Sequence, residues 1–222
     1  MNKTTVKKRI EKAIRRYATA PSSRAFRLVP QSLTSGKLYE AHVLSIVIEK
    51  LATEESFQIT LINSNFIPLK SAPGPINRSY PYFQLRRGGL VDAELWTDVE
   101  FISLSYDQRG VARPLQRGDY HELDILVTDT GVNGRPMHSN IWLGVECKNT
   151  GYTKGLLKEI LGIRRELSLL QNPRSTKFSQ WPRAQVPAEP NSCLMVFSTD
   201  PGVSNYTGPG EVFGIDFYHE DI

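Results

Sequence analysis

Two apolar runs separated by a short turn-rich segment constrain the fold of this chain more than any other feature. Residues 120–128 and 140–148 are rich in branched aliphatic side chains, which favour β-strands. The segment between them holds Gly131 and the pair Asn133-Gly134, which are strong turn residues. The pattern predicts two neighbouring strands of one sheet.

Charged side chains follow the polar side of both predicted strands. Alternation along a strand predicts an apolar core face on the first strand, built from Leu123, Ile125 and Val127. Asp124 then lies on the opposite face, with Glu146 and Lys148 beside it on the second strand, where residues two apart are about 6–7 Å from each other. A buried cluster of charge is costly unless a cation compensates it. The sequence therefore predicts a divalent cation at Asp124, Glu146 and Lys148, the alternative being a half-exposed hairpin with a cross-strand ion pair.

A third carboxylate falls in an apolar helix face. Residues 36–51 predict a helix that is N-capped by Ser35 or Thr34. Glu40 falls in the middle of its apolar stripe, where an ionised carboxylate is costly unless it is paired or lies near a metal. The opposite face is expected to be solvated and carries His42, Ser45 and Glu49. Glu40 is thus a further candidate metal ligand, or else the buried partner of an Arg or Lys.

These elements follow one another in a familiar order. A helix with an inward Glu, a strand Asp, a Glu-x-Lys strand and a further helix resemble the PD-(D/E)xK nuclease superfamily over about residues 36–170. Asp124 matches its acidic metal ligand, Glu146 and Lys148 match its (D/E)xK element, and Glu40 matches its helical Glu. The proline of the superfamily's name is absent before Asp124. The resemblance implies a mixed α/β fold with a restriction-endonuclease-like core, in which a central mixed β-sheet is flanked by α-helices.

The resemblance also implies an activity. It is that of a Mg²⁺-dependent endonuclease acting on DNA, with Mn²⁺ as a substitute cofactor. Mg²⁺ is held by one or two carboxylates plus substrate phosphate, here Asp124 and Glu146, with the backbone carbonyl of Cys147 and with Glu40 as further ligands. A metal-activated water would attack the phosphodiester, and Lys148 would orient that water or neutralise the phosphate.

Two interpretations from other classes remain open. The first is a catalytically silent module with a nuclease fold, which binds nucleic acid or assembles a complex. The second is a structural protein whose ion cluster staples the sheet, with Glu40 paired to Lys148. The sequence has no GxSxG elbow, P-loop or GxGxxG turn, and its two cysteines lack metal-type spacing.

Basic side chains that could contact nucleic-acid phosphates are unevenly distributed. Residues 1–16 hold seven Lys or Arg and one Glu, so the net charge of this segment is +6. The whole chain has a net charge of +4, so the remaining residues carry −2. The candidates come from this segment, from a predicted helix near 153–170 and from a basic loop; they are Lys7, Lys8, Arg15, Arg16, Lys154, Lys158, Arg174, Lys177 and Arg183. The alternatives are a solubilising or oligomer-contacting arm, ordinary surface charge and a disordered loop.

Length and composition predict the domain organisation. A basic N-terminal helix over 1–20 precedes a single nuclease-like domain over 21–222. That domain divides into a core over 36–170, a Pro-rich loop without regular structure over 171–191, and C-terminal strands over 192–218. No stretch reaches the ~20 apolar residues of a membrane span. We therefore expect a cytoplasmic protein without membrane contact, with a homodimer or partner proteins supplying its specificity.

Overall fold

A large mixed sheet forms the centre of the molecule. The computed structural model describes residues 3–20, 27–29, 34–64, 66–68, 70, 72–110 and 113–222. Eight strands pair in the order β1-β3-β5-β6-β7-β8-β11-β12. They are β1 (Ala18–Thr19), β3 (Gln58–Ile62), β5 (Tyr82–Arg87), β6 (Leu90–Ile102), β7 (Tyr120–Asp129), β8 (Ile141–Lys148), β11 (Cys193–Ser198) and β12 (Ile215–His219). Neighbouring strands from β3 to β8 are antiparallel. The other pairs are parallel: β1 with β3, β8 with β11, and β11 with β12.

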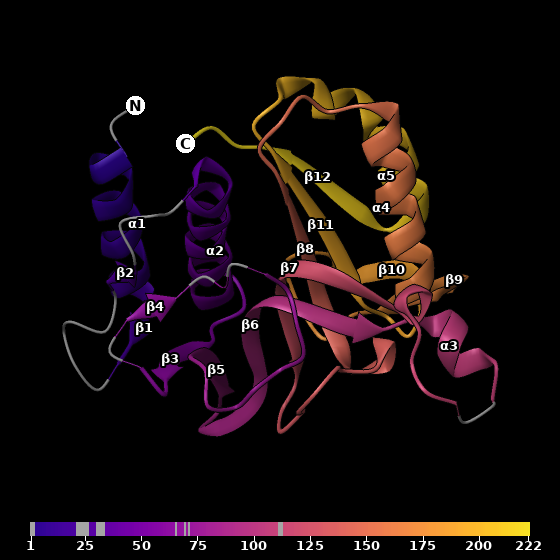
Figure 1. The fold of residues 1–222 in the computed structure, drawn as a ribbon, viewed down its shortest axis with the longest axis horizontal. Coiled ribbons are helices and arrows are strands. Elements are labelled where there is room, and N and C mark those ends of the chain that lie inside the picture. The colour runs from indigo at the N-terminus through magenta and orange to yellow at the C-terminus, as the bar shows by residue number, and fades with distance from the viewer. Residues whose placement is uncertain are drawn as a thin grey trace.

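Helices cover both faces of this sheet, which confirms the predicted mixed α/β fold (Figure 1). On one face α1 (Lys3–Tyr17) and α2 (Ser35–Thr53) share a core with the sheet, called here the α2-side core. On the other face α4 (Lys154–Leu167) contributes to a second core, called here the α4-side core, and α5 (Thr207–Phe213) lies beside it. The smaller elements are α3 (Leu104–Gln108), η1 (Arg117–Asp119), η2 (His138–Asn140), η3 (Pro201–Tyr206) and the short strands β2 (Leu28–Val29) and β4 (Ile67–Pro68).

The helix α2 is buried on nearly all sides. Thr34 is its N-cap, as the sequence allows, and accepts a hydrogen bond from the Lys37 N–H at 3.2 Å. His42 and Ser45 are buried, so their predicted solvated face is wrong. That face is covered because α1 packs on α2 through Val6, Ile10 and Ile14, and because the Glu220 carboxylate lies 3.0 Å from the His42 ring. A helix that is apolar nearly all round belongs inside a fold.

Residues 171–191 are structured, contrary to the prediction of an irregular loop. The strands β9 (Leu169–Ser175) and β10 (Gln185–Glu189) form an antiparallel pair, and Trp181 between them is buried. The Glu55 carboxylate orders this connection by accepting hydrogen bonds from the backbone N–H groups of Ser179, Gln180 and Trp181 at 2.5–2.8 Å. A single buried carboxylate far away in the chain thus fixes the irregular connection between two strands that the prolines did not predict.

The predicted C-terminal strands over 192–218 are also wrong in part. Residues 201–213 form η3 and α5, and the last strand begins at Ile215. The Asp200 side chain caps η3 by accepting from the Gly202 N–H at 2.8 Å, and Gly214 ends α5 with a φ of 68°. Glycine adopts this left-handed backbone at little cost. The Pro/Gly-rich composition of this segment conceals the two short helices.

Candidate active site

Two strands of the sheet change their core face at an aspartate. In β6, Leu95 packs in the α2-side core and Val99 in the α4-side core, although both have odd numbers. In β7, Ile125 and Leu123 differ in the same way. The predicted common face of Leu123, Ile125 and Val127 is therefore wrong. The two-residue alternation is broken between these pairs, at Asp98 and Asp124.

The backbone at Asp98 explains the break in β6. Asp98 has a φ of 52°, a left-handed conformation that is uncommon for a residue other than glycine. Asp and Asn tolerate this conformation better than most residues do. A strand with one left-handed residue turns its following side chains to the other face, so Asp98 lies where the two cores meet.

Asp124 lies where β7 and β8 separate. Their ladder runs from Thr128 opposite Ile141 to Ile125 opposite Val145, while β8 stays paired with β11 as far as Lys148. Beyond that point the Asp124 carboxylate accepts a hydrogen bond from the Cys147 N–H at 2.7 Å. This bond fixes the orientation of the carboxylate in the fork.

Three carboxylates from three elements meet at this fork. Oxygens of Glu40, Asp98 and Asp124 lie within 4.8 Å of one another, and we call these residues the carboxylate cluster. The Lys37 ammonium contacts Glu40 at 2.6 Å and Asp98 at 2.5 Å. Asp98 is buried and its Oδ2 atom has no hydrogen-bond partner among the described residues. An unsatisfied buried oxygen of this kind is a free ligand position.

Glu146 and Lys148 lie beside the carboxylate cluster rather than within it. The Lys148 ammonium contacts the Glu146 carboxylate at 2.9 Å and that of Glu159, on α4, at 2.9 Å. Glu146 is buried, and its Oε1 atom has no partner in the described part of the chain. The staple interpretation paired Lys148 with Glu40, whereas the lysine in contact with Glu40 is Lys37.

Burial, together with the charges of neighbouring carboxylates, raises the pKa values of the acids in this site. Burial raises the pKa of Glu40 to about 7, with the charges of Asp124 and Asp98 adding to the effect and Lys37 opposing it. Burial also raises the pKa of Asp124, and burial together with the Asp124 charge raises that of Glu146. Burial lowers the pKa of Lys148, but the neighbouring carboxylates outweigh it and keep this group protonated. A divalent cation would relieve the repulsion among these carboxylates.

The donor set fits a hard cation. Mg²⁺ prefers carboxylate and carbonyl oxygens and keeps several waters. The fork supplies Glu40, Asp98 and Asp124, and Glu146 lies beside them; Asp98 and Glu146 each carry a buried oxygen without a partner among the described residues. These ligand types are the ones that a magnesium or manganese ion prefers.

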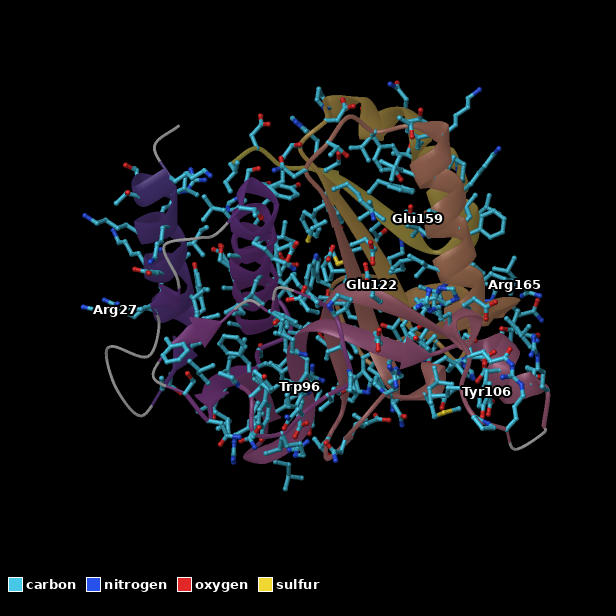
Figure 2. The ribbon with its side chains drawn as sticks, viewed as in Figure 1. Arg27, Trp96, Tyr106, Glu122, Glu159 and Arg165 are labelled. Carbon is cyan, nitrogen blue, oxygen red and sulfur yellow. The ribbon has the colours of Figure 1, made fainter. Side chains whose placement is uncertain are left out.

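A groove adjoins Glu146 on the side of α4. It has a volume of about 330 Å³ and is lined by His121, Glu122, Glu146, Lys158, Glu159, Gly162 and Ile163. Glu122 projects from β7 and Glu159 from α4, on the two sides of the groove (Figure 2). The groove is therefore an open extension of the site.

The predicted phosphate contacts are spread over the molecule. Lys154 and Lys158 are exposed on α4, and Lys158 lines the groove. The helix α1, which carries Lys7, Lys8, Arg15 and Arg16, lies on the far side of α2 from the sheet centre (Figure 1). In the β9–β10 segment Arg174 pairs with Glu189, Lys177 lies over the Trp142 ring and Arg183 pairs with Asp216. Of the nine candidates, the structure places Lys158 at the groove beside Glu146.

Three residues of the site escaped the sequence analysis. Asp98 had no signal, because its position depends on a backbone kink within a regular strand pattern. Lys37 precedes Glu40 by three residues on a helix, a spacing that brings side chains together and could have indicated it. Lys70 donates to the Asp98 carbonyl at 3.2 Å and comes from an irregular segment without a motif.

Comparisons with known proteins do not identify the chain. No protein-family model matches it, and no curated protein does. Among solved structures, the crystal structure of protein VC1899 from Vibrio cholerae is similar, with 14% sequence identity and a TM-score of 0.35. The match covers 83% of this chain and 30% of that protein, so the chain spans less than a third of its length. Such a likeness indicates neither fold nor function. Within the described ranges, no helix is long and apolar enough to cross a membrane.

Proposed function

We propose that this protein is a Mg²⁺-dependent phosphodiester hydrolase, an endonuclease acting on DNA in the cytoplasm. The observation that carries the proposal is the meeting of Glu40, Asp98 and Asp124 within 4.8 Å, at a strand fork that also holds Glu146 and Lys148. Acidic ligands with an adjacent ammonium suit a reaction that needs both a metal and phosphate neutralisation. The resemblance to PD-(D/E)xK nucleases supports the same activity.

Each side chain has a role that follows from its position. Asp124 and Glu146 would hold Mg²⁺, with the Cys147 carbonyl, Glu40 and Asp98 available as further ligands. Bound there, the ion would lower the pKa of a water and stabilise negative charge on the phosphate. Lys148, protonated and in contact with Glu146, would hold a phosphate oxygen or orient the attacking water. DNA remains the preferred substrate by resemblance, and a homodimer or partner proteins would supply specificity.

A catalytically silent module is the second candidate. Lys37 favours it, because an internal ammonium at 2.6 and 2.5 Å already neutralises part of the carboxylate cluster. In such a module the ion pairs would hold α2 on the sheet, and nucleic acid would be bound without being cut.

A cleavage panel separates the two candidates. Plasmid, linear duplex, single-stranded DNA and RNA are incubated with the protein in Mg²⁺, Mn²⁺ or EDTA. We expect cleavage of at least one DNA substrate in either metal, none in EDTA, and a strong loss in Lys148→Ala. Binding of these substrates without cleavage in Mg²⁺ or Mn²⁺ would favour the silent module and overturn the hydrolase.

A further inference from the structure

We propose that the groove between β7 and α4 binds an unpaired nucleobase that carries an exocyclic amino group. The inference rests on the proposed function, because that function places the scissile phosphate at Glu146 and Lys148, next to the groove. It adds the class of substrate. The preferred DNA is single-stranded or locally opened, and one of its adenine or cytosine bases occupies the groove.

The size and walls of the groove suit a flat ring. Its volume of about 330 Å³ lies at the lower end of ligand sites, which begin at about 300 Å³. Ile163 supplies apolar surface, and on the β7 side the His121 ring is held against Phe101 at 5.9 Å between centroids. Bases bind to proteins largely through such ring and apolar contacts.

Gly162 keeps the groove open on the side of α4. A Cβ atom added there would meet nothing within 4 Å, so a larger side chain would extend into free space. Glycine destabilises a helix interior relative to alanine. A glycine at this position therefore weakens α4 while leaving room beside the candidate active site.

The charges of the groove favour a base over a phosphate. Three carboxylates, Glu122, Glu146 and Glu159, line it against one ammonium, Lys158, so the lining has a net negative charge that would repel a phosphate inside the groove. These three do not form a group close enough to share a cation, since the group that does is Glu40, Asp98 and Asp124 among the described residues.

Two exposed charged residues of the lining, Glu122 and Lys158, are available to bind a ligand. No side-chain hydrogen bond or ion pair within the described chain engages Glu122 or Lys158, which approach from β7 and α4. A carboxylate can only accept hydrogen bonds and an ammonium can only donate them. On their Watson–Crick edges adenine and cytosine offer an amino donor next to a ring acceptor, whereas guanine has a ring N–H donor there and thymine lacks the amino group.

The occupant must also be unpaired. In a duplex each base is stacked and its amino group already pairs with the opposite strand, so a base reaches a protein pocket only from a single strand or after extrusion. The groove thus selects for strand state as well as for base type.

Binding of short oligonucleotides in Ca²⁺ tests the inference. Fluorescence anisotropy compares hexamers of deoxycytidine, deoxythymidine and an abasic backbone, with intact oligonucleotide verified on gels. We expect the cytidine hexamer to bind at least about fivefold more tightly than the other two, the lower end of one base contact. Equal affinities of all three for the wild-type protein would overturn the inference.

Two variants at one exposed helical position supply the control. Gly162→Leu fills the groove and is expected to remove the preference for cytidine, whereas Gly162→Ala strengthens the helix and retains it. A full preference in Gly162→Leu, with thermal unfolding showing a folded protein, would also overturn the inference.

The outcome is separable from that of the proposed function. A cytidine preference in Ca²⁺ without any cleavage in Mg²⁺ or Mn²⁺ would support the base-binding groove and contradict the proposed hydrolase activity. Metal-dependent cleavage without a base preference would do the reverse. Glu122→Gln keeps a hydrogen-bonding group but loses the charge, and we expect it to reduce the preference for cytidine over thymidine severalfold.

Discussion

Replacing Asp124 by asparagine should lower DNA cleavage by at least about a thousandfold, because under the proposed function the substitution removes a charged metal ligand from the centre of the fork. The asparagine side chain would keep the shape of the aspartate and an oxygen that can still accept from the Cys147 N–H. Initial cleavage rates in Mg²⁺ measure the effect. Asp129→Asn, the same change at the other end of β7, serves as the matched control and is expected to cleave at the wild-type rate.

The same variant should be more stable than the wild type in metal-free buffer at pH 8. Burial raises the folded pKa of Asp124 and Glu146, and that of Glu40 reaches about 7, above the usual values of 3.8 for Asp and 4.5 for Glu. At these three groups the folded protein binds more protons than the unfolded chain, so their contribution to stability falls as the pH rises from about 4 through 8. Asp124→Asn should flatten this decline in urea unfolding. Wild-type cleavage by the variant, or an unchanged pH profile, would contradict the assignment.

Replacing Lys148 by methionine should lower the cleavage rate by about a hundredfold to a thousandfold while metal binding persists, since in the proposed function the ammonium acts on phosphate or water and is not a metal ligand. Lys148 is protonated at neutral pH because carboxylates surround it, and methionine has a similar length without the charge. Single-turnover cleavage at saturating Mg²⁺ isolates the chemical step. Lys50→Met, which removes a lysine paired to Glu54 on the surface, is the control.

The opposite pattern would assign Lys148 to another role. If Lys148→Met lost metal binding and cleavage together, the lysine would only be holding Glu146 and Glu159 in place. If the variant cleaved at the wild-type rate, no role in the reaction would remain for it.

The pattern of apolar residues along the sequence was sufficient to predict the two strands and the helix that hold most residues of the candidate active site. The strands at 120–129 and 141–148 and the helix at 35–53 follow from apolar periodicity and a threonine cap, and these three elements bring Glu40 and Asp124 together. The apolar periodicity predicted where these elements lie but not all of their faces, because Leu123 packs on the opposite side of the sheet from Ile125, and His42 is buried.

The remaining features depend on contacts between distant segments. The left-handed φ of Asp98 reverses the faces of β6, and no residue pattern within the strand indicates it. The burial of His42 requires α1 and the C-terminal residues to pack on α2, and the order of residues 176–183 requires Glu55 from another part of the chain. Such tertiary interactions override local propensity.

Manganese binding at pH 8 tests most directly whether the fork is a cation site. Titration of the wild-type protein, followed by the electron paramagnetic resonance of free Mn²⁺, should show saturable binding that Mg²⁺ competes away. Asp124→Asn should abolish this binding and Asp129→Asn should preserve it. An absence of saturable binding at millimolar Mn²⁺, or binding undiminished in Asp124→Asn, would contradict a metal centre built from these carboxylates.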